Sequence, residues 1–189
     1  MAVRNKTDFI ANEIYYITFT ILDWQHVFTS DKYCQLVYKW FDYAKNKYDN
    51  RIHGYVIMPN HIHGIIIIID ATLQGGTDVQ NKVGATLAVA QNNRAGARPA
   101  PTIGEIVGTF KSSCINDWLK YIKMNEVNAD GKFWQRNYYE HVIRNESELN
   151  RIREYIASNP LKWQFDRENL CRTTDTKYEA EWQWLEGDL

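Results

Sequence analysis

Residues 55–69 read YVIMPNHIHGIIIII, and this stretch decides the fold. Two runs of β-branched and aromatic residues flank a Pro-Asn dipeptide, which is typical of a compact turn, so the sequence predicts a β-hairpin. Five consecutive isoleucines follow Gly64, and this indicates a second strand that is covered on both faces. Because side chains alternate across a strand, we expect His61 and His63 on one face, at the edge of a buried region.

Further elements are predicted on both sides of this hairpin. Composition predicts strands over residues 13–22 and 132–144, and apolar residues recur at helical spacing over 30–50, 103–122 and 145–160. The order is therefore strand, helix, strand, strand, helix, strand, helix. The simplest fold for this order is α+β, a ferredoxin-like (RRM-like) antiparallel sheet with helices packed on it.

A chain of 189 residues fits one domain, which we expect to comprise residues 1–160. Residues 71–102 contain seven alanines and four glycines and give little to pack, so we expect a mobile insertion within the domain. Residues 161–189 form a C-terminal tail in this division. The tail carries seven acidic and four basic residues, a net charge of −3, and leaves +2 for residues 1–160.

The composition narrows the class of protein. Three cysteines without CxxC spacing argue against a disulfide framework and against a cysteine zinc site. The first residues are too polar for a signal peptide, and the isoleucine run is far shorter than a membrane helix. We therefore expect a cytoplasmic protein.

The histidine pair and the last helix carry side chains suited to phosphate chemistry. Two imidazoles on one strand face could share a metal ion, although two histidines beside a turn would show the same spacing. Tyr155 and Asn159 are four residues apart and share a helix face, with Arg151 one turn earlier. A hydroxyl, an amide oxygen and a guanidinium suit the roles of nucleophile, metal ligand and anion clamp, but each is also common in ordinary packing.

Three segments in this order resemble the REP-associated tyrosine transposase branch of the single-tyrosine HUH endonuclease and transposase superfamily. They are MPNHIHG (58–64), GEIVGTFKSS (104–113) and WQRNYYEHVIRNESELNRIREYIASNP (134–160). The resemblance runs from about residue 13 to residue 160. It implies a metal-dependent endonuclease and strand transferase that acts on single-stranded DNA, at hairpins of palindromic repeats, through a 5′-phosphotyrosine intermediate.

The resemblance also implies roles for single residues. His61 and His63 match the HUH pair, Tyr155 matches the nucleophile, and Asn159 takes the position of a third polar metal ligand. Mg²⁺ or Mn²⁺ suits such a site better than zinc. Tyr138 is the reserve candidate for the nucleophile. The candidates for DNA contacts are Lys111, Arg136, His141, Arg144 and Arg151.

Alternatives stay open at this stage. The same fold could serve a non-catalytic protein that binds single-stranded nucleic acid, or a metal-dependent phosphoesterase in which water attacks the phosphate. In relatives the C-terminal extension helps to recognise DNA, whereas the acidic tail here could instead pack over the active site. Insertion-sequence relatives act as dimers and REP-associated ones can act as monomers, so a homodimer is compatible with the sequence.

Overall fold

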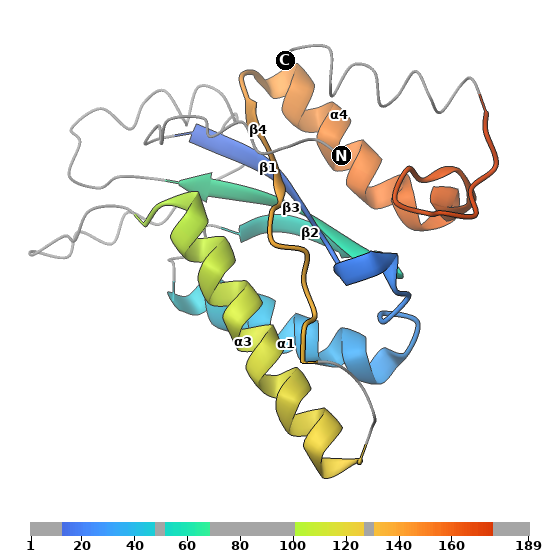
Figure 1. Cartoon of the computed structure of the whole chain (residues 1–189). Coiled ribbons are helices and arrows are strands. Elements are labelled where there is room, and N and C mark those ends of the chain that lie inside the picture. Colours follow the sequence, from blue (N-terminus) through green and yellow to red (C-terminus); the bar gives the residue numbers. More distant parts are fainter. Residues whose placement is uncertain (1–12, 48–51, 69–100, 127–130, 176–189) are drawn as a thin grey trace, which may run out of the picture.

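The computed structural model describes residues 13–47, 52–68, 101–126 and 131–175 (Figure 1). The predicted insertion at 71–102 lies outside the described residues except for its last two, and so does the tail beyond residue 175. Within the described part of the chain, no helix is long and apolar enough to cross a membrane.

The described residues form an antiparallel sheet whose four strands lie in the order β2-β3-β1-β4. This is the strand order of a ferredoxin-like fold, so the predicted α+β class is confirmed. The strands are β1 (Glu13–Thr20), β2 (Ile52–Ile57), β3 (His61–Ile68) and β4 (Tyr139–Ile143). The helices are α1 (Asp31–Lys47), α3 (Ile103–Met124) and α4 (Glu146–Ser158), with short 3-10 helices η1 (Leu22–Trp24) and η2 (Asn159–Phe165).

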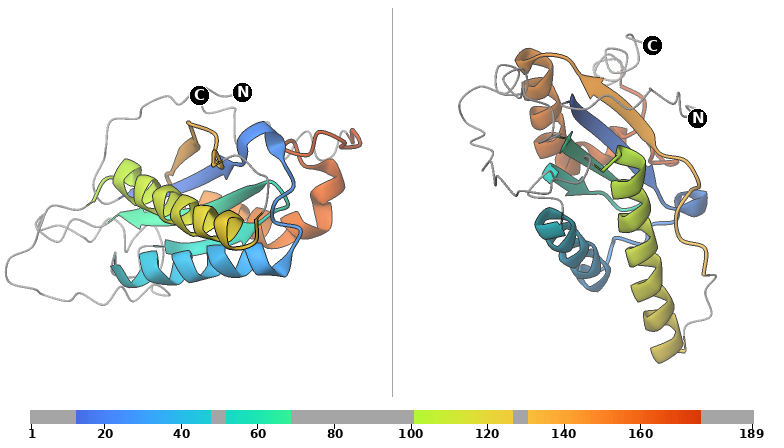
Figure 2. Two further views of the ribbon diagram at one scale, coloured as in Figure 1. Left: turned by 60° about the horizontal axis from the view of Figure 1, so that its bottom comes forward. Right: turned by 90° about the vertical axis from the view of Figure 1, so that its left-hand side faces the viewer.

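Helices cover both faces of the sheet. In Figure 1, α1 and α3 lie below the strands and α4 lies above them, and the two views of Figure 2 show the same layers from other sides. Alternate residues of β1 and β3 pack against α1 and α3 in one apolar core, including Phe19, Ile62 and Ile66. The intervening residues, including Ile65 and Ile67, pack against α4 in a second core. The isoleucine run thus follows from burial on both faces.

The strand predicted over residues 132–144 is shorter than expected. Regular pairing begins only at Tyr139, and before it a single bridge joins Trp134 to Ile21. Phe133 and Trp134 are neighbours in sequence, yet both are buried in the core under α1 and α3. Strand alternation would send them to opposite faces, so this segment is irregular.

Candidate metal centre

The two histidines lie side by side at the start of β3, on the face covered by α4. Both are completely buried, and their Nε2 atoms are 2.9 Å apart. Their partners across the sheet are Thr20 and Thr18 of β1. The prediction that the two imidazoles share one strand face is therefore confirmed.

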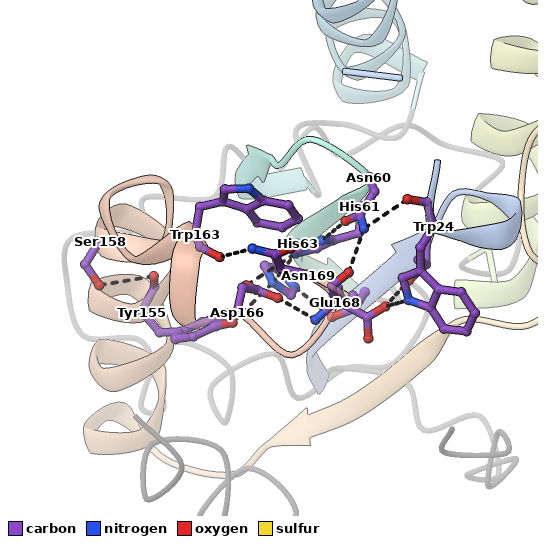
Figure 3. A network of polar contacts seen from close by, with 12 residues as sticks. Trp24, Asn60, His61, His63, Tyr155, Ser158, Trp163, Asp166, Glu168 and Asn169 are labelled. Carbon is purple, nitrogen blue, oxygen red and sulfur yellow. Dashed lines mark hydrogen bonds and ion pairs between the residues drawn. The ribbon is translucent and has the colours of Figure 1, made fainter. Parts of the chain in front are cut away.

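A third side chain joins them from a segment that sequence reasoning did not single out. Asp166 directly follows η2 and is 4 % exposed, and its Oδ2 is 3.7 Å from Nε2 of His61. One ligand atom from each of the three side chains lies within 4.8 Å of the others. Figure 3 shows the three side chains meeting beside Tyr155. Asp166 Oδ1 accepts a hydrogen bond from the backbone N–H of Glu168, while Oδ2 has no hydrogen-bond partner among the described residues.

Burial sets the protonation of these groups. It lowers the pKa of His61 to about 3 and holds the pKa of His63 well below its usual range, so both imidazoles are neutral at neutral pH. Burial also raises the pKa of Asp166, while the neighbouring His63 acts in the opposite direction. Neutral imidazole is the form that binds metal, because one ring nitrogen then offers a lone pair.

The three side chains fit a divalent cation. Two donor atoms that each lie about 2.1 Å from an ion and subtend a right angle are about 3.0 Å apart, close to the separation of the two Nε2 atoms. The buried carboxylate oxygen without a partner is otherwise costly, and a cation would satisfy it. His61, His63 and Asp166 could therefore hold a metal ion, and the donor set of two nitrogens and one oxygen does not select a single metal.

The far nitrogens of both rings are also occupied. Nδ1 of His63 lies 2.8 Å from the hydroxyl of Tyr16 and 2.8 Å from that of Thr18. Nδ1 of His61 lies 2.8 Å from Oδ1 of Asn60, the residue before it in the chain. Such outer partners orient the rings of metal-binding histidines.

Tyr155 reaches the same place from α4. Its side chain is 8 % exposed, and its hydroxyl is 3.3 Å from Nε2 of His63. Burial raises the pKa of Tyr155 well above the usual value, so the hydroxyl keeps its proton at neutral pH. Asn159, one turn later, is 1 % exposed, and its side chain lowers the pKa of both Tyr155 and Asp166. The structure thus brings together the four residues predicted for metal binding and attack, and adds Asp166.

The loop that carries Asp166 is fastened to the body of the domain by Glu168. Its carboxylate accepts a hydrogen bond from Trp24 Nε1 at 2.7 Å (Figure 3). It accepts another from Thr20 Oγ1 at 3.2 Å. Its backbone carbonyl accepts one from Asn60 Nδ2 at 2.6 Å. The ring centroids of Trp163 and His61 are 6.1 Å apart. The described part of the predicted tail therefore packs over the histidines.

The candidate DNA-binding residues lie apart from this cluster. Arg136, Arg144 and Arg151 are exposed. The ammonium of Lys111 donates hydrogen bonds to the backbone carbonyls of Gln135 at 2.9 Å and Asn137 at 3.1 Å, and burial lowers its pKa to about 8. Lys111 thus fastens the irregular segment before β4, and contact of these four residues with DNA stays a prediction.

His141 has a structural partner as well. It pairs with the carboxylate of Glu148, which also accepts a hydrogen bond from the backbone N–H of Arg144. Asn145 caps α4 by accepting a hydrogen bond from the N–H of Glu148 at 2.9 Å. These contacts fix the start of α4 on β4. Tyr138, the reserve nucleophile, is buried in the core on the opposite face of the sheet.

Sequence comparisons find a curated relative but no family. No family model matches the chain. An uncharacterized protein of Haemophilus influenzae is 39% identical over 117 residues, which is 62% of this chain and 58% of that protein. The chain therefore spans less than two thirds of the curated relative it matches.

A comparison with solved structures supports the fold. One of these structures is described as a REP-associated tyrosine transposase bound to a REP hairpin, and it superposes with a TM-score of 0.51 at 15% sequence identity. The match covers 86% of this chain and 74% of that structure. Similarity at this level of identity concerns the backbone, so the chain has a transposase-like α+β fold.

Proposed function

We propose that this protein is a metal-dependent endonuclease and strand transferase for single-stranded DNA, with Tyr155 as its nucleophile. The position of Tyr155 carries the proposal. Its hydroxyl is 3.3 Å from Nε2 of His63, which is one of the three candidate metal ligands. The hydroxyl of Tyr16 faces the far nitrogen of His63, Nδ1, whereas that of Tyr155 faces Nε2, the nitrogen on the side of His61 and Asp166. A sequence resemblance and a shared fold with a hairpin-bound transposase support hairpins of palindromic repeats as the substrate.

The proposed reaction is a transesterification. The hydroxyl oxygen of Tyr155 attacks a phosphorus atom of the DNA backbone, the bond from phosphorus to the 3′ oxygen breaks, and that oxygen leaves with a proton as a 3′-hydroxyl. The protein is then joined by a phosphodiester to the 5′ end of the DNA segment that lies 3′ of the cut, and the 3′-hydroxyl of another strand can attack this link in the reverse sense. Mg²⁺ or Mn²⁺ held by His61, His63 and Asp166, with Asn159 as an additional proposed ligand, would neutralise charge on the phosphate.

Access to the site is part of the proposal. Tyr155, Asp166 and both histidines are buried, so a phosphodiester can reach them only if a covering segment moves. The loop fastened by Glu168 is the candidate, because it crosses the site from outside the sheet and the Glu168 carboxylate holds it to η1 and β1 through two hydrogen bonds that could open. The exposed residues Arg136, Arg144 and Arg151 are proposed to contact DNA phosphates away from the cut.

One observation favours a second candidate, a phosphoesterase in which water attacks. Burial raises the pKa of Tyr155 well above its usual value, which makes its hydroxyl a poor nucleophile in the protein without metal. In that case Tyr155 would only position the substrate. The two candidates differ in whether a covalent link to DNA forms.

The deciding experiment uses single-stranded hairpin oligonucleotides labelled at either the 5′ or the 3′ end, incubated with the protein and Mn²⁺ or Mg²⁺ and separated on a denaturing gel. We expect a metal-dependent protein–DNA band that carries only the label 3′ of the cut and is lost in Tyr155→Phe. Cleavage without this band would favour attack by water. Binding without cleavage, with several hairpins and both metals, would favour a non-catalytic binding protein.

A further inference from the structure

The orientation of one buried amide determines how His61 is protonated. Asn60 is completely buried, and its Nδ2 lies 2.6 Å from the carbonyl oxygen of Glu168 and 3.4 Å from that of Trp24. Carbonyl oxygens can only accept hydrogen bonds, so the amide atom that faces them must be the NH₂ group. The other amide atom, Oδ1, therefore faces His61.

This orientation fixes the tautomer of His61. Oδ1 of Asn60 can only accept, so Nδ1 of His61, 2.8 Å away, must carry the hydrogen. A neutral imidazole has only one N–H, so Nε2 of His61 has a free lone pair. That lone pair lies 2.9 Å from Nε2 of His63, on the side where Asp166 lies. Even before an ion binds, His61 is therefore already in the tautomer that metal binding requires.

His63 is held differently. Its Nδ1 faces the hydroxyls of Tyr16 and Thr18, and a hydroxyl can donate or accept a hydrogen bond. Both tautomers of His63 are therefore compatible with its surroundings. Because Nε2 of His61 has no hydrogen, the short contact between the two Nε2 atoms is a hydrogen bond only if Nε2 of His63 carries one. Without metal, His63 should be protonated on Nε2, and a cation would require the hydrogen on Nδ1.

We infer that Asn60 is a positioning residue with two tasks. Through Oδ1 it presets His61 as a metal ligand, and through Nδ2 it ties His61 to the loop that carries Asp166, 106 residues further along the chain. His63 is the ligand that changes tautomer when the ion binds. The inference deepens the proposed metal site and rests on it, but the tautomers belong to the metal-free protein and do not depend on DNA cleavage.

Three variants separate these tasks. Asn60→Ala removes both the acceptor for His61 and the donor to the loop. Asn60→Asp keeps an acceptor for His61 but turns its second oxygen toward two carbonyl oxygens, which repel it. Asn169→Ala is the matched control, because buried Asn169 holds the same loop through Trp163 and Cys171 and makes no hydrogen bond to His61 in the described part of the chain.

The first measurement is nitrogen NMR of the full-length, metal-free protein with ¹⁵N-labelled histidines, assigned with His61→Gln and His63→Gln. We expect His61 to be protonated on Nδ1 and His63 on Nε2. When Zn²⁺ is added as a diamagnetic probe, only His63 should change tautomer, from a hydrogen on Nε2 to one on Nδ1. Asn60→Ala should give His61 a mixture of both tautomers, whereas Asn60→Asp and Asn169→Ala should keep it on Nδ1. His61 protonated on Nε2 in the wild type would overturn the inference, even if no variant folds.

The second measurement is calorimetric titration with Mn²⁺. Loss of an outer partner of a metal-binding histidine typically weakens binding by about 10–100-fold, and we expect this for Asn60→Ala, with a smaller loss for Asn60→Asp. Equal losses in Asn60→Ala and Asn169→Ala, with an unchanged His61 tautomer, would reduce Asn60 to a loop anchor and overturn the inference. If the two histidines had the expected tautomers but the protein cleaved no DNA, the result would count against the proposed function and not against the role of Asn60.

Discussion

The two faces of the sheet are built from the same strands but differ in what they bury. Under α1 and α3 the strands contribute apolar side chains along their length, such as Phe19 and Ile66. Under α4 the later part of β3 is equally apolar, as at Ile65, but the first residues of β3 on this face are the polar His61 and His63. The same alternation of β3 thus produces an ordinary core on one face and a site on the other.

The difference shows where this protein departs from the packing that is best for stability. Polar groups buried as deeply as His61, His63 and Asp166 are unfavourable unless they are paired, and Oδ2 of Asp166 has no hydrogen bond among the described residues. A layer under selection for stability alone would continue with isoleucine. The polar end of the α4 face fits the proposed metal site better than it fits a layer built for stability, so mutations on the two faces should have different consequences.

The largest difference is expected between two tyrosines on opposite faces. Tyr155→Phe should lower DNA cleavage by at least about 1000-fold, because it removes the attacking oxygen and leaves the ring in place. Tyr138→Phe, in the core under α1 and α3, should cleave within a few-fold of wild type. Initial rates on a labelled hairpin measure both. If Tyr138→Phe were the inactive variant, the nucleophile would lie on the other face and the assignment of the site would be wrong.

Much of this comparison could be predicted from sequence, because it depends on local periodicity. Alternation placed His61 and His63 on one face, and helical spacing placed Tyr155 and Asn159 together on the last helix. The turn at Pro59 made the hairpin recognisable. Each of these inferences uses residues that are close in sequence.

The parts that could not be predicted depend on contacts between distant segments. Asp166 follows Pro160, where the helical pattern stops, and it reaches the histidines because η2 turns the chain and Asn60 binds the carbonyl of Glu168. Spacing gives no information on such a contact. The nearest signal is the charged and polar run DREN at 166–169, which follows η2, the segment after the helix with the proposed nucleophile.

Neighbouring isoleucines of β3 give the next largest effect. Ile65 and Ile66 are 1 % and 2 % exposed and point to opposite faces. Either substitution by alanine should lower the free energy of unfolding by about 2–5 kcal/mol, because each leaves a cavity. Only Ile65→Ala, two residues from His63, should also weaken Mn²⁺ binding. Urea unfolding and calorimetry test this, and equal metal affinities in the two variants would contradict it.

Two carboxylates of one loop distinguish metal binding from loop anchoring. Asp166→Asn should weaken Mn²⁺ binding by about 10–100-fold, because the charged oxygen near His61 is lost. Glu168→Gln should bind within about three-fold of wild type, because a glutamine oxygen can still accept from Trp24 and Thr20. Calorimetry at one pH and salt concentration compares them. A greater loss in Glu168→Gln would mean that the loop, and not the carboxylate of Asp166, determines affinity.

The smallest effect concerns a charge on the apolar face. Lys111 extends from α3 over the ring of Tyr138, and burial lowers its pKa from 10.5 to about 8. The unfolded chain therefore holds this proton more tightly than the folded protein does. Between about pH 8 and pH 10.5 the unfolded state binds more protons, so this group makes stability rise with pH.

Lys111→Met should remove that rise. We expect the free energy of unfolding of the wild type to gain about 1–2 kcal/mol over the variant between pH 8 and pH 10.5, less than the full shift implies because the side chain keeps some contact with solvent. Urea unfolding of both proteins at several pH values measures the difference in the free energy of unfolding. Tyrosines that titrate in the same pH range contribute equally to both proteins, so their effect cancels in this difference. Parallel curves would mean that the two backbone carbonyls hold the ammonium as well as water does, and that this face tolerates a charge without cost.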